Sequence, residues 1–288
     1  MNSPVTKLLV LGATGMLGNA VVRFFAGSPG FDVWGSARSQ PPPAAAPVLR
    51  ERVLSGMDVE NADSLLRLFA RIQPDVVINC VGLIKQLEAA SDPLLAISIN
   101  SLLPHRLARL CQTAGARLVH VSTDCVFTGS RGMYRESDPC DAQDLYGRSK
   151  LLGEVDYPNA ITLRTSIIGH ELSGHHGLLG WFLHQEAGVR GYRRAVFSGF
   201  STLELARVIR DFVLPRPELH GLYHVSAEPI VKFDLLRLVA QQYGKYVAIE
   251  PDDKLVIDRS LDSSRFRGAT GYAPPTWPEM VRAMHAFG

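Results

Sequence analysis

The stretch Lys7-Leu-Leu-Val-Leu-Gly-Ala-Thr-Gly-Met-Leu-Gly18 decides the fold of this chain of 288 residues. Its first half is a short apolar run, typical of a strand that is buried on both faces of a parallel sheet. Its second half has glycines three residues apart, and the residues that follow, 19–26, have a helical pattern. Between a strand and a helix, such glycines let the backbone turn sharply and bring a pyrophosphate close to the free amides of the helix N-terminus. We therefore predict a dinucleotide-binding loop formed by Gly12, Thr14, Gly15, Met16, Leu17 and Gly18.

Strand-like and helix-like segments alternate through the first 165 residues. Short apolar runs typical of buried strands are found at 31–37, 53–54, 75–79, 118–121 and 161–164. Helical patterns lie between them at 63–72, 94–114 and 145–155. This alternation predicts βαβ units and a parallel sheet covered by helices. The predicted fold class is therefore α/β: a Rossmann-type doubly wound parallel sheet, with a smaller C-terminal substrate-binding domain.

The alternation weakens after Thr165, where a second domain is expected. Residues 169–191 are rich in glycine and histidine, which predicts a loop region able to close over a ligand. We expect the nucleotide-binding domain to comprise residues 1–165 together with about 195–225, and the substrate-binding cap to comprise about 166–194 and 226–288.

The composition excludes several classes of protein. The chain has 30 lysines and arginines against 28 aspartates and glutamates, and the net charge of +2 favours neither a nucleic-acid partner nor a polybasic membrane partner. No stretch approaches the roughly 18 to 20 apolar residues of a membrane span. The four cysteines are widely spaced, as expected of reduced thiols in a cytoplasmic protein. His170 and His175 are five residues apart, which does not place them on one helical face as a zinc protease requires, so no metal site is expected.

The end of the second predicted strand indicates which dinucleotide binds. Enzymes of this fold that bind NAD usually carry an acidic residue here, which holds the ribose 2′-hydroxyl. This chain instead has Ser36 and Arg38, a hydroxyl and a planar cation that suit a phosphate. We therefore expect NADP(H). The alternative is that Arg38 is a solvated side chain beside the proline-rich loop 40–47.

Three polar side chains indicate carbonyl chemistry. Tyr146 and Lys150 are four residues apart and so share one face of a predicted helix. An ammonium near a phenol favours the phenolate and lowers the pKa of the phenol from its usual value of about 10. Thr123 lies just past a buried strand, at the sheet edge where ligands bind, and its hydroxyl can donate a hydrogen bond to a carbonyl oxygen that gains negative charge. The alternative is that Ser122 and Thr123 only cap the end of the strand.

These elements together resemble the extended short-chain dehydrogenase/reductase superfamily, and three stretches narrow the resemblance to the dTDP-4-dehydrorhamnose reductase family. The stretches are Ser122-Thr-Asp-Cys-Val-Phe127, Tyr134-Arg-Glu-Ser-Asp138 and Tyr146-Gly-Arg-Ser-Lys-Leu-Leu-Gly-Glu154. The resemblance implies an NADPH-dependent reduction of a 4-keto-6-deoxy sugar that is carried on a nucleoside diphosphate and destined for a surface polysaccharide.

The resemblance also assigns roles to individual residues. It implies that Thr123, Tyr146 and Lys150 are the catalytic set. In this set Tyr146 protonates the keto oxygen, and Lys150 lowers the pKa of the phenol and holds the nicotinamide ribose. It implies that Asn100 supports a proton relay beside the cofactor, the alternative being a simple amide on the surface of a helix. The remaining residues that it places at the cofactor are Asp58, Val59, Cys80, Val81 and Gly82, together with Tyr146 and Lys150 themselves.

The chain departs from the family pattern at the expected sugar site. Cys125 stands where the reductases usually carry tyrosine and where sugar 4,6-dehydratases carry an acid, and the missing acid argues against dehydratase chemistry. Asp124, Cys125 and Lys85 are candidate substrate contacts, and Lys85 is otherwise an exposed loop lysine. Cationic side chains at 190–194 are a further candidate for the diphosphate, because charge-assisted bonds to phosphate suit them.

Two other functions are compatible with these residues. One is an epimerase that retains NAD and shows no net use of cofactor, which Arg38 argues against. The other is a regulatory subunit without activity, since that of methionine adenosyltransferase resembles the same reductase family. We also expect a possible homodimer, because helices such as those that carry Asn100 and Tyr146 form a two-fold interface in the superfamily.

Overall fold

The computed structural model describes residues 5–85 and 91–288 of the chain. Its internal contacts divide the chain into two compact units. The first unit consists of Met1–Ser122, Asp144–Leu163 and Pro217–Leu222, and the second of Thr123–Gln143, Arg164–Arg216 and Tyr223–Gly288. Residues 195–216 thus group with the second unit, whereas the sequence analysis grouped them with the nucleotide-binding domain. Which unit binds which ligand stays a prediction.

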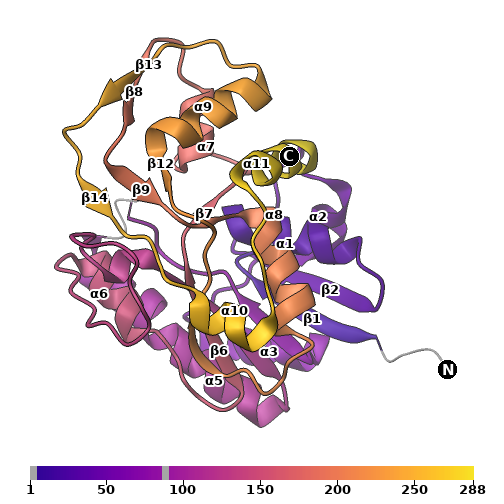
Figure 1. The fold of residues 1–288 in the computed structure, drawn as a ribbon. Coiled ribbons are helices and arrows are strands. Elements are labelled where there is room, and N and C mark those ends of the chain that lie inside the picture. The colour runs from indigo at the N-terminus through magenta and orange to yellow at the C-terminus, as the bar shows by residue number, and fades with distance from the viewer. Residues whose placement is uncertain (1–4, 86–90) are drawn as a thin grey trace. The chain divides into compact units, whose positions relative to one another are not determined.

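A seven-stranded sheet forms the centre of the first unit (Figure 1). Its strands are β1 (Thr6–Leu11), β2 (Phe31–Ser36), β3 (Val53–Leu54), β4 (Val76–Asn79), β5 (Arg117–Thr123), β6 (Ala160–Thr165) and β11 (Gly221–His224). They lie in the order β11-β6-β5-β4-β1-β2-β3, and β1 pairs in parallel with both β2 and β4. The order therefore reverses between β1 and β4, which is where ligands bind in sheets of this kind. The predicted Rossmann-type fold class is confirmed.

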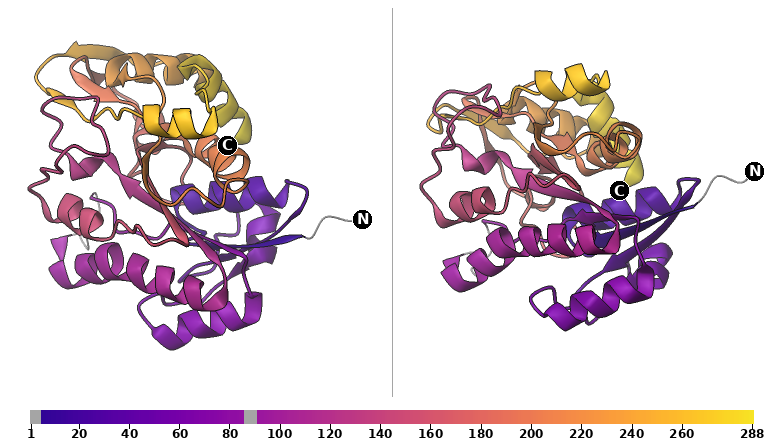
Figure 2. Two further views of the ribbon diagram at one scale, coloured as in Figure 1. Left: turned by 60° about the horizontal axis from the view of Figure 1, so that its bottom comes forward. Right: turned by 90° about the horizontal axis from the view of Figure 1, so that it is seen from below.

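Helices cover both faces of this sheet, and residues 8–11 of β1 are therefore completely buried. The helical segments of this unit are α1 (Met16–Ala26), α2 (Pro47–Arg52), α3 (Ala62–Ile72), α4 (Pro93–Ala96), the π-helical η2 (Ile97–Leu102), α5 (Leu103–Ala114) and α6 (Leu145–Leu152). On one face, α3 and α5 pack against Leu9 and Leu11 in a single apolar cluster. The run α4–η2–α5 forms a long helix, drawn in purple and magenta in Figure 2.

The second unit combines small sheets with helices. Its elements beyond those above are the 3₁₀ turn η3 (Asp124–Val126), β7 (Ile167–Ile168), α7 (Leu178–Leu183), β8 (Val189–Tyr192), β9 (Ala195–Phe197), β10 (Phe200–Ser201), α8 (Thr202–Val208), η4 (Ile209–Val213), β12 (Ile230–Val231), α9 (Lys232–Tyr243), β13 (Ile249–Asp252), β14 (Ile257–Asp258), α10 (Ser264–Thr270) and α11 (Trp277–Phe287). The small sheets have the orders β10-β7, β12-β9-β14 and β13-β8.

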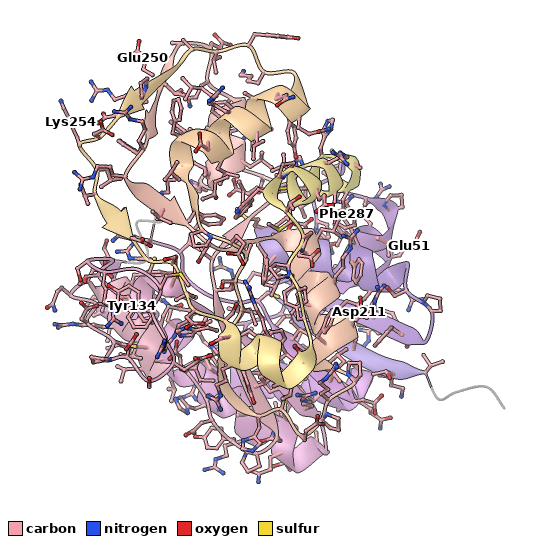
Figure 3. The ribbon with its side chains drawn as sticks, in the orientation of Figure 1. Glu51, Tyr134, Asp211, Glu250, Lys254 and Phe287 are labelled. Atoms are coloured by element: carbon pink, nitrogen blue, oxygen red, sulfur yellow. The ribbon has the colours of Figure 1, made fainter. Side chains whose placement is uncertain are left out.

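The loop that follows β5 is fixed inside the second unit by stacking and by backbone pairing. The rings of Phe127 and Tyr134 stack with centroids 4.1 Å apart, and Tyr134 is labelled in Figure 3. Tyr134 also forms a β-bridge with Leu261 near the C-terminus. The segment 123–143 is therefore held by residues more than a hundred positions later in the chain.

Residues 169–191 are not a loop throughout, contrary to the expectation from their composition. They contain α7 and most of β8. The glycines and histidines hid an apolar pattern, in which Leu179 and Phe182 are buried one helical turn apart. Within residues 5–85 and 91–288, no helix is both long and apolar enough to cross a bilayer.

The close approach of Gly18 to the preceding turn predicts a strong effect of added volume. A β-carbon at Gly18 would lie 2.1 Å from the carbonyl oxygen of Gly12. We expect Gly18→Ala to lower the free energy of unfolding by roughly 1–3 kcal/mol, because backbone has to shift. Gly268→Ala, in α10 with nothing within 4 Å, is the matched control and should raise that free energy by roughly 0.5–1 kcal/mol. Urea unfolding followed by circular dichroism measures both, and equal effects of the two substitutions would contradict the packing argument.

Candidate active site

The glycine-rich loop is shaped by backbone contacts at the ends of β1, β2 and β4. Gly12 has a φ of +79°, a left-handed conformation that favours glycine. Its amide donates to the carbonyl of Ser36 over 3.1 Å. A β-carbon on Gly12 would lie 3.1 Å from the backbone of Cys80. Gly15 is exposed and begins α1, whose N-terminus has no capping side chain. The amides of Gly12 and Ala13 are bonded to Ser36, and that of Gly15 to Gly12, so the amides at the start of α1 are the candidates for an anion. Binding of a pyrophosphate at this loop stays a prediction.

Ser36 and Arg38 differ in their surroundings. Ser36 is buried at the end of β2, whereas Arg38 is exposed two residues later. The backbone carbonyl of Arg38 accepts a hydrogen bond from Gly56 over 3.1 Å. Within the described residues, no hydrogen bond or ion pair of the Arg38 guanidinium is found. The guanidinium is thus available to a phosphate.

Asp58 and Val59 follow β3 and differ in exposure. Asp58 is exposed, and its carboxylate accepts a hydrogen bond from the amide of Glu60 over 2.9 Å. Val59 packs partly against the apolar cluster of the first unit. Contact of either residue with an adenine stays a prediction.

The end of β4 lies beside the two polar groups expected near the nicotinamide. A β-carbon on Gly82 would be 3.4 Å from Oδ1 of Asn100 and 3.7 Å from Nζ of Lys150. Val81 is held by its amide, which donates to Oδ1 of Asn79 over 3.1 Å. The structure therefore brings Gly82, Asn100 and Lys150 together, although they come from three separate segments.

The buried side chain of Asn100 bonds to two separate segments of the chain, and we call this pair of contacts the Asn100 clamp. Asn100 is 1% exposed and lies in the π-helical segment η2, a kind of helix that is frequent at functional sites. Its Oδ1 accepts from the amide of Leu83 over 2.9 Å, and its Nδ2 donates to Oγ of Ser149 over 3.1 Å. Its side chain thus joins the loop after β4 to α6, and it is not a simple surface amide. Its support of a proton relay stays a prediction.

Tyr146 and Lys150 lie on α6, which begins at a well-formed cap. The carboxylate of Asp144 accepts from the amide of Gly147 over 2.7 Å. Tyr146 is half-buried, whereas Lys150 is only 5% exposed. Nζ of Lys150 donates to the carbonyl of Val121 on β5 over 3.0 Å. Burial lowers the pKa of Lys150 to about 8, while nearby Glu154 and Cys80 oppose that shift.

Thr123 follows Val121 and Ser122 along β5 and belongs to the second unit. Its Oγ1 accepts from the amide of Cys125 over 3.1 Å and lies 3.2 Å from Oδ1 of Asp124, to which it donates. The hydroxyl therefore caps the short turn η3, which follows the strand. Its catalytic role stays a prediction.

Asp124 and Cys125 lie near two cations of the second unit. Arg259 donates from Nε to the carbonyl of Phe127 over 2.7 Å and from Nη1 to Sγ of Cys125 over 3.8 Å. Burial raises the pKa of Asp124, and the charges of Arg259 and Lys232 oppose that rise. Sugar contacts of Asp124 and Cys125 stay predictions.

Lys85 has a partner that the sequence did not indicate. Its Nζ bonds to Oδ2 of Asp144 over 2.7 Å, which ties the loop after β4 to the N-cap residue of α6. In the second unit, Arg190 and Arg193 likewise pair with acids, Asp252 and Asp253. Contact of these cations with a diphosphate stays a prediction and would require them to exchange partners.

Two contributors to these sites were missed from the sequence. Glu154 accepts a hydrogen bond from Ser122 and lies four residues after Lys150, a spacing that could have drawn attention to it. Arg259 lies 134 residues from Cys125, and no local pattern links the two.

Comparisons with known proteins identify the family and agree with the fold. The family model described as "RmlD substrate binding domain" matches residues 6–284. The chain is similar to a probable low-salt glycan biosynthesis reductase, Agl14 of Haloferax volcanii, at 35% identity over 55% of this chain and 52% of the relative, so the match spans about half of that protein. It is similar to a dTDP-4-dehydrorhamnose reductase of Aggregatibacter actinomycetemcomitans at 25% identity over 98% of this chain and 99% of the relative. Its fold matches the crystal structure of dTDP-4-dehydrorhamnose reductase from Bacillus anthracis in complex with NADP, with a TM-score of 0.82, 20% identity and 99% coverage of both chains.

The clamp formed by Asn100 predicts a loss of stability when its amide is removed. Asn100→Ala leaves the buried amide of Leu83 without its acceptor, so the free energy of unfolding should fall by roughly 1–3 kcal/mol. The exposed helical amide Gln241 provides the control, since Gln241→Ala should change that free energy by less than about 0.5 kcal/mol. Thermal and urea unfolding measure both variants. A fully stable Asn100→Ala protein would contradict the clamp.

Proposed function

The chain belongs to the family of the RmlD substrate binding domain, the dTDP-4-dehydrorhamnose reductase family, and we propose that it reduces a nucleoside-diphosphate 4-keto-6-deoxy sugar with NADPH. The product would serve the synthesis of a surface polysaccharide. The observation that carries the proposal is the buried ammonium of Lys150, which lies four residues after Tyr146 and next to Gly82 at the end of β4. Burying an ionisable amine costs free energy. A buried amine with a shifted pKa at the ligand-binding edge of a Rossmann-type sheet is therefore typical of a functional site.

The residues of the first unit fit a dinucleotide. The loop at Gly12 and Gly15 turns so tightly that a β-carbon at either residue would lie within 3.3 Å of backbone atoms. The amides at the start of α1 suit a pyrophosphate. Arg38 and Ser36 would hold the 2′-phosphate that distinguishes NADPH from NADH. Bound NADPH would supply the hydride to the carbonyl carbon of the sugar.

The chain itself handles the proton and the developing charge. As the keto oxygen becomes negative, the phenol of Tyr146 gives it a proton and becomes a phenolate, which the ammonium of Lys150 stabilises. The hydroxyl of Thr123 would turn from Asp124 to donate to the same oxygen. Because this charge exists only during the reaction, these donors stabilise the transition state more than the bound substrate. We assign the cofactor contacts to the first unit, and the sugar contacts of Asp124 and Cys125 to the second.

The protein is also proposed to act in the cytoplasm as a homodimer. No disulfide joins the four cysteines, which all lie in the described part of the chain, and this suits a reducing compartment. Leu94, Ile97 and Leu152 are 81%, 50% and 65% exposed. They lie on α4, on η2 and at the end of α6, three segments in mutual contact that such a dimer would cover. A monomeric mass by analytical ultracentrifugation would contradict the dimer, and recovery of the protein from the periplasm would contradict the location.

Tyr146→Phe tests the chemistry. We expect kcat to fall on the order of a hundredfold or more, because the proton donor is lost, while the Kd for NADPH stays within about twofold. The assay follows NADPH absorbance with a panel of nucleotide keto sugars. Tyr246→Phe, at a side chain 97% exposed, is the control and should keep full activity. Near-normal turnover of Tyr146→Phe refutes the mechanism, and wild-type protein that never consumes NADPH points to the epimerase or the regulatory subunit.

Arg38→Ala tests the cofactor. Loss of a charged partner for the 2′-phosphate should lower the preference for NADPH over NADH by about ten- to a hundredfold, measured as the ratio of the two Kd values. Arg71→Ala, at an exposed arginine of α3, serves as the control and should leave the ratio unchanged. If Arg38→Ala also leaves it unchanged, another group recognises the phosphate.

A further inference from the structure

Lys150 and Glu154 attach the C-terminal end of α6 to two consecutive residues of β5. Nζ of Lys150 donates to the carbonyl of Val121 over 3.0 Å. Oε1 of Glu154 accepts from Oγ of Ser122 over 2.7 Å, and Ser122 is 4% exposed. An ammonium and a carboxylate therefore meet the same stretch of strand, directly before Thr123.

Gly153 allows Glu154 to reach this position. It ends α6, and a β-carbon there would lie 1.9 Å from the carbonyl oxygen of Asn100. The chain can therefore pass close to η2 and direct Glu154 toward β5 only because residue 153 lacks a side chain. The position of the carboxylate follows from close packing and not from a flexible surface loop.

The charges around Lys150 single out Glu154. The titratable groups that act on Lys150 or on which it acts are Glu154, Cys80 on the segment after β4, and His120 on β5. Burial raises the pKa of Cys80 to about 12 and lowers that of His120 far below its usual value, so both are uncharged near neutral pH. Among these three groups, the carboxylate of Glu154 is the one that provides an opposite charge for the buried ammonium.

We propose that Glu154, fixed by its hydrogen bond to Ser122, is a positioning residue that keeps the amine of Lys150 charged and directed at the active site. This rests on the proposed function, because the charged amine is what would stabilise the Tyr146 phenolate and hold the nicotinamide ribose. Without the carboxylate, Cys80 is left as the other group that favours the charged amine, and its thiol is uncharged near neutral pH. Desolvation then dominates, and the amine loses its proton within the pH range of the reaction. Glu154 touches neither substrate nor cofactor in this scheme, and acts through Lys150.

A direct titration of Lys150 tests the proposal without any turnover. The full-length protein is labelled with ¹³C at the lysine Cε, and Lys150→Arg identifies the resonance that belongs to Lys150. We expect a midpoint near pH 8 in the wild type. Glu154→Gln keeps the shape and the acceptor oxygen but removes the charge, and should lower the midpoint by roughly one to three pH units. Asp156→Asn removes an exposed charge two residues further along the chain and should leave the midpoint unchanged.

An unchanged midpoint in folded Glu154→Gln protein overturns the proposal. Ser122→Ala keeps the charge but removes its anchor, and should also lower the midpoint. If Glu154→Gln does not fold, the midpoint of the Ser122→Ala variant decides whether the proposal holds. An unchanged midpoint in Ser122→Ala overturns the role of that hydrogen bond.

Enzyme assays separate this proposal from the proposed function. In an active enzyme, the alkaline limb of the kcat profile should move down in Glu154→Gln by the same interval as the Lys150 midpoint, with the KM for the sugar changed less than about twofold. Full activity with an unmoved limb overturns the positioning role alone. A shifted midpoint in a protein that reduces no keto sugar leaves the pairing in place and refutes the reductase.

Discussion

A buried ammonium group needs an acceptor for its protons and an opposite charge within reach, and the contact between α6 and β5 supplies both to Lys150. The carbonyl of Val121 accepts a hydrogen bond from Nζ, and Glu154, bonded to Ser122, provides the opposite charge. If this contact were looser, water would reach the amine and its orientation would be lost. Under the proposed mechanism, the charge on Lys150 would therefore depend on how closely one helix end packs on one strand.

That close packing is possible because glycines lie at several tight contacts in the first unit. Gly18 lies against the carbonyl of Gly12, Gly153 against that of Asn100, and Gly35 against Ala13. Each contact lets a helix or a loop approach the sheet by the width of a side chain. The side chain of Asn100 then adds hydrogen bonds to Leu83 and Ser149, which hold the loop after β4 and α6 in place together. These contacts would hold the proposed proton donor Tyr146 and the ammonium of Lys150 in one geometry.

In the second unit, the segment 123–143 has little regular structure of its own, so contacts with other segments hold it. Late parts of the chain hold it: Arg259 bonds to the carbonyl of Phe127, and the amide of His224 donates to Glu136 over 2.8 Å. Phe127 also lies under the guanidinium of Arg164, 5.1 Å from its carbon to the ring centroid. These contacts hold the segment that carries Asp124 and Cys125, the residues expected at the sugar. Changes in this framework offer a route to different sugar specificities on the same reductase core.

The sequence by itself determined the features that are encoded in local spacing. The apolar run before Gly12 specified the first strand, the glycine spacing specified the turn, and the interval from Tyr146 to Lys150 placed both on one helix. Together with the stretches that resemble the reductase family, these were enough for the fold class and the family. Residues 169–191 were misread because composition hid the short apolar pattern of α7. Tertiary structure alone decided that Glu154 bonds to Ser122, that Asn100 is a buried clamp, and that Arg259 reaches Cys125 across 134 residues. Such pairings depend on how strands and helices pack in space. Because packing can bring together residues at any separation, the partners have no characteristic spacing in the sequence.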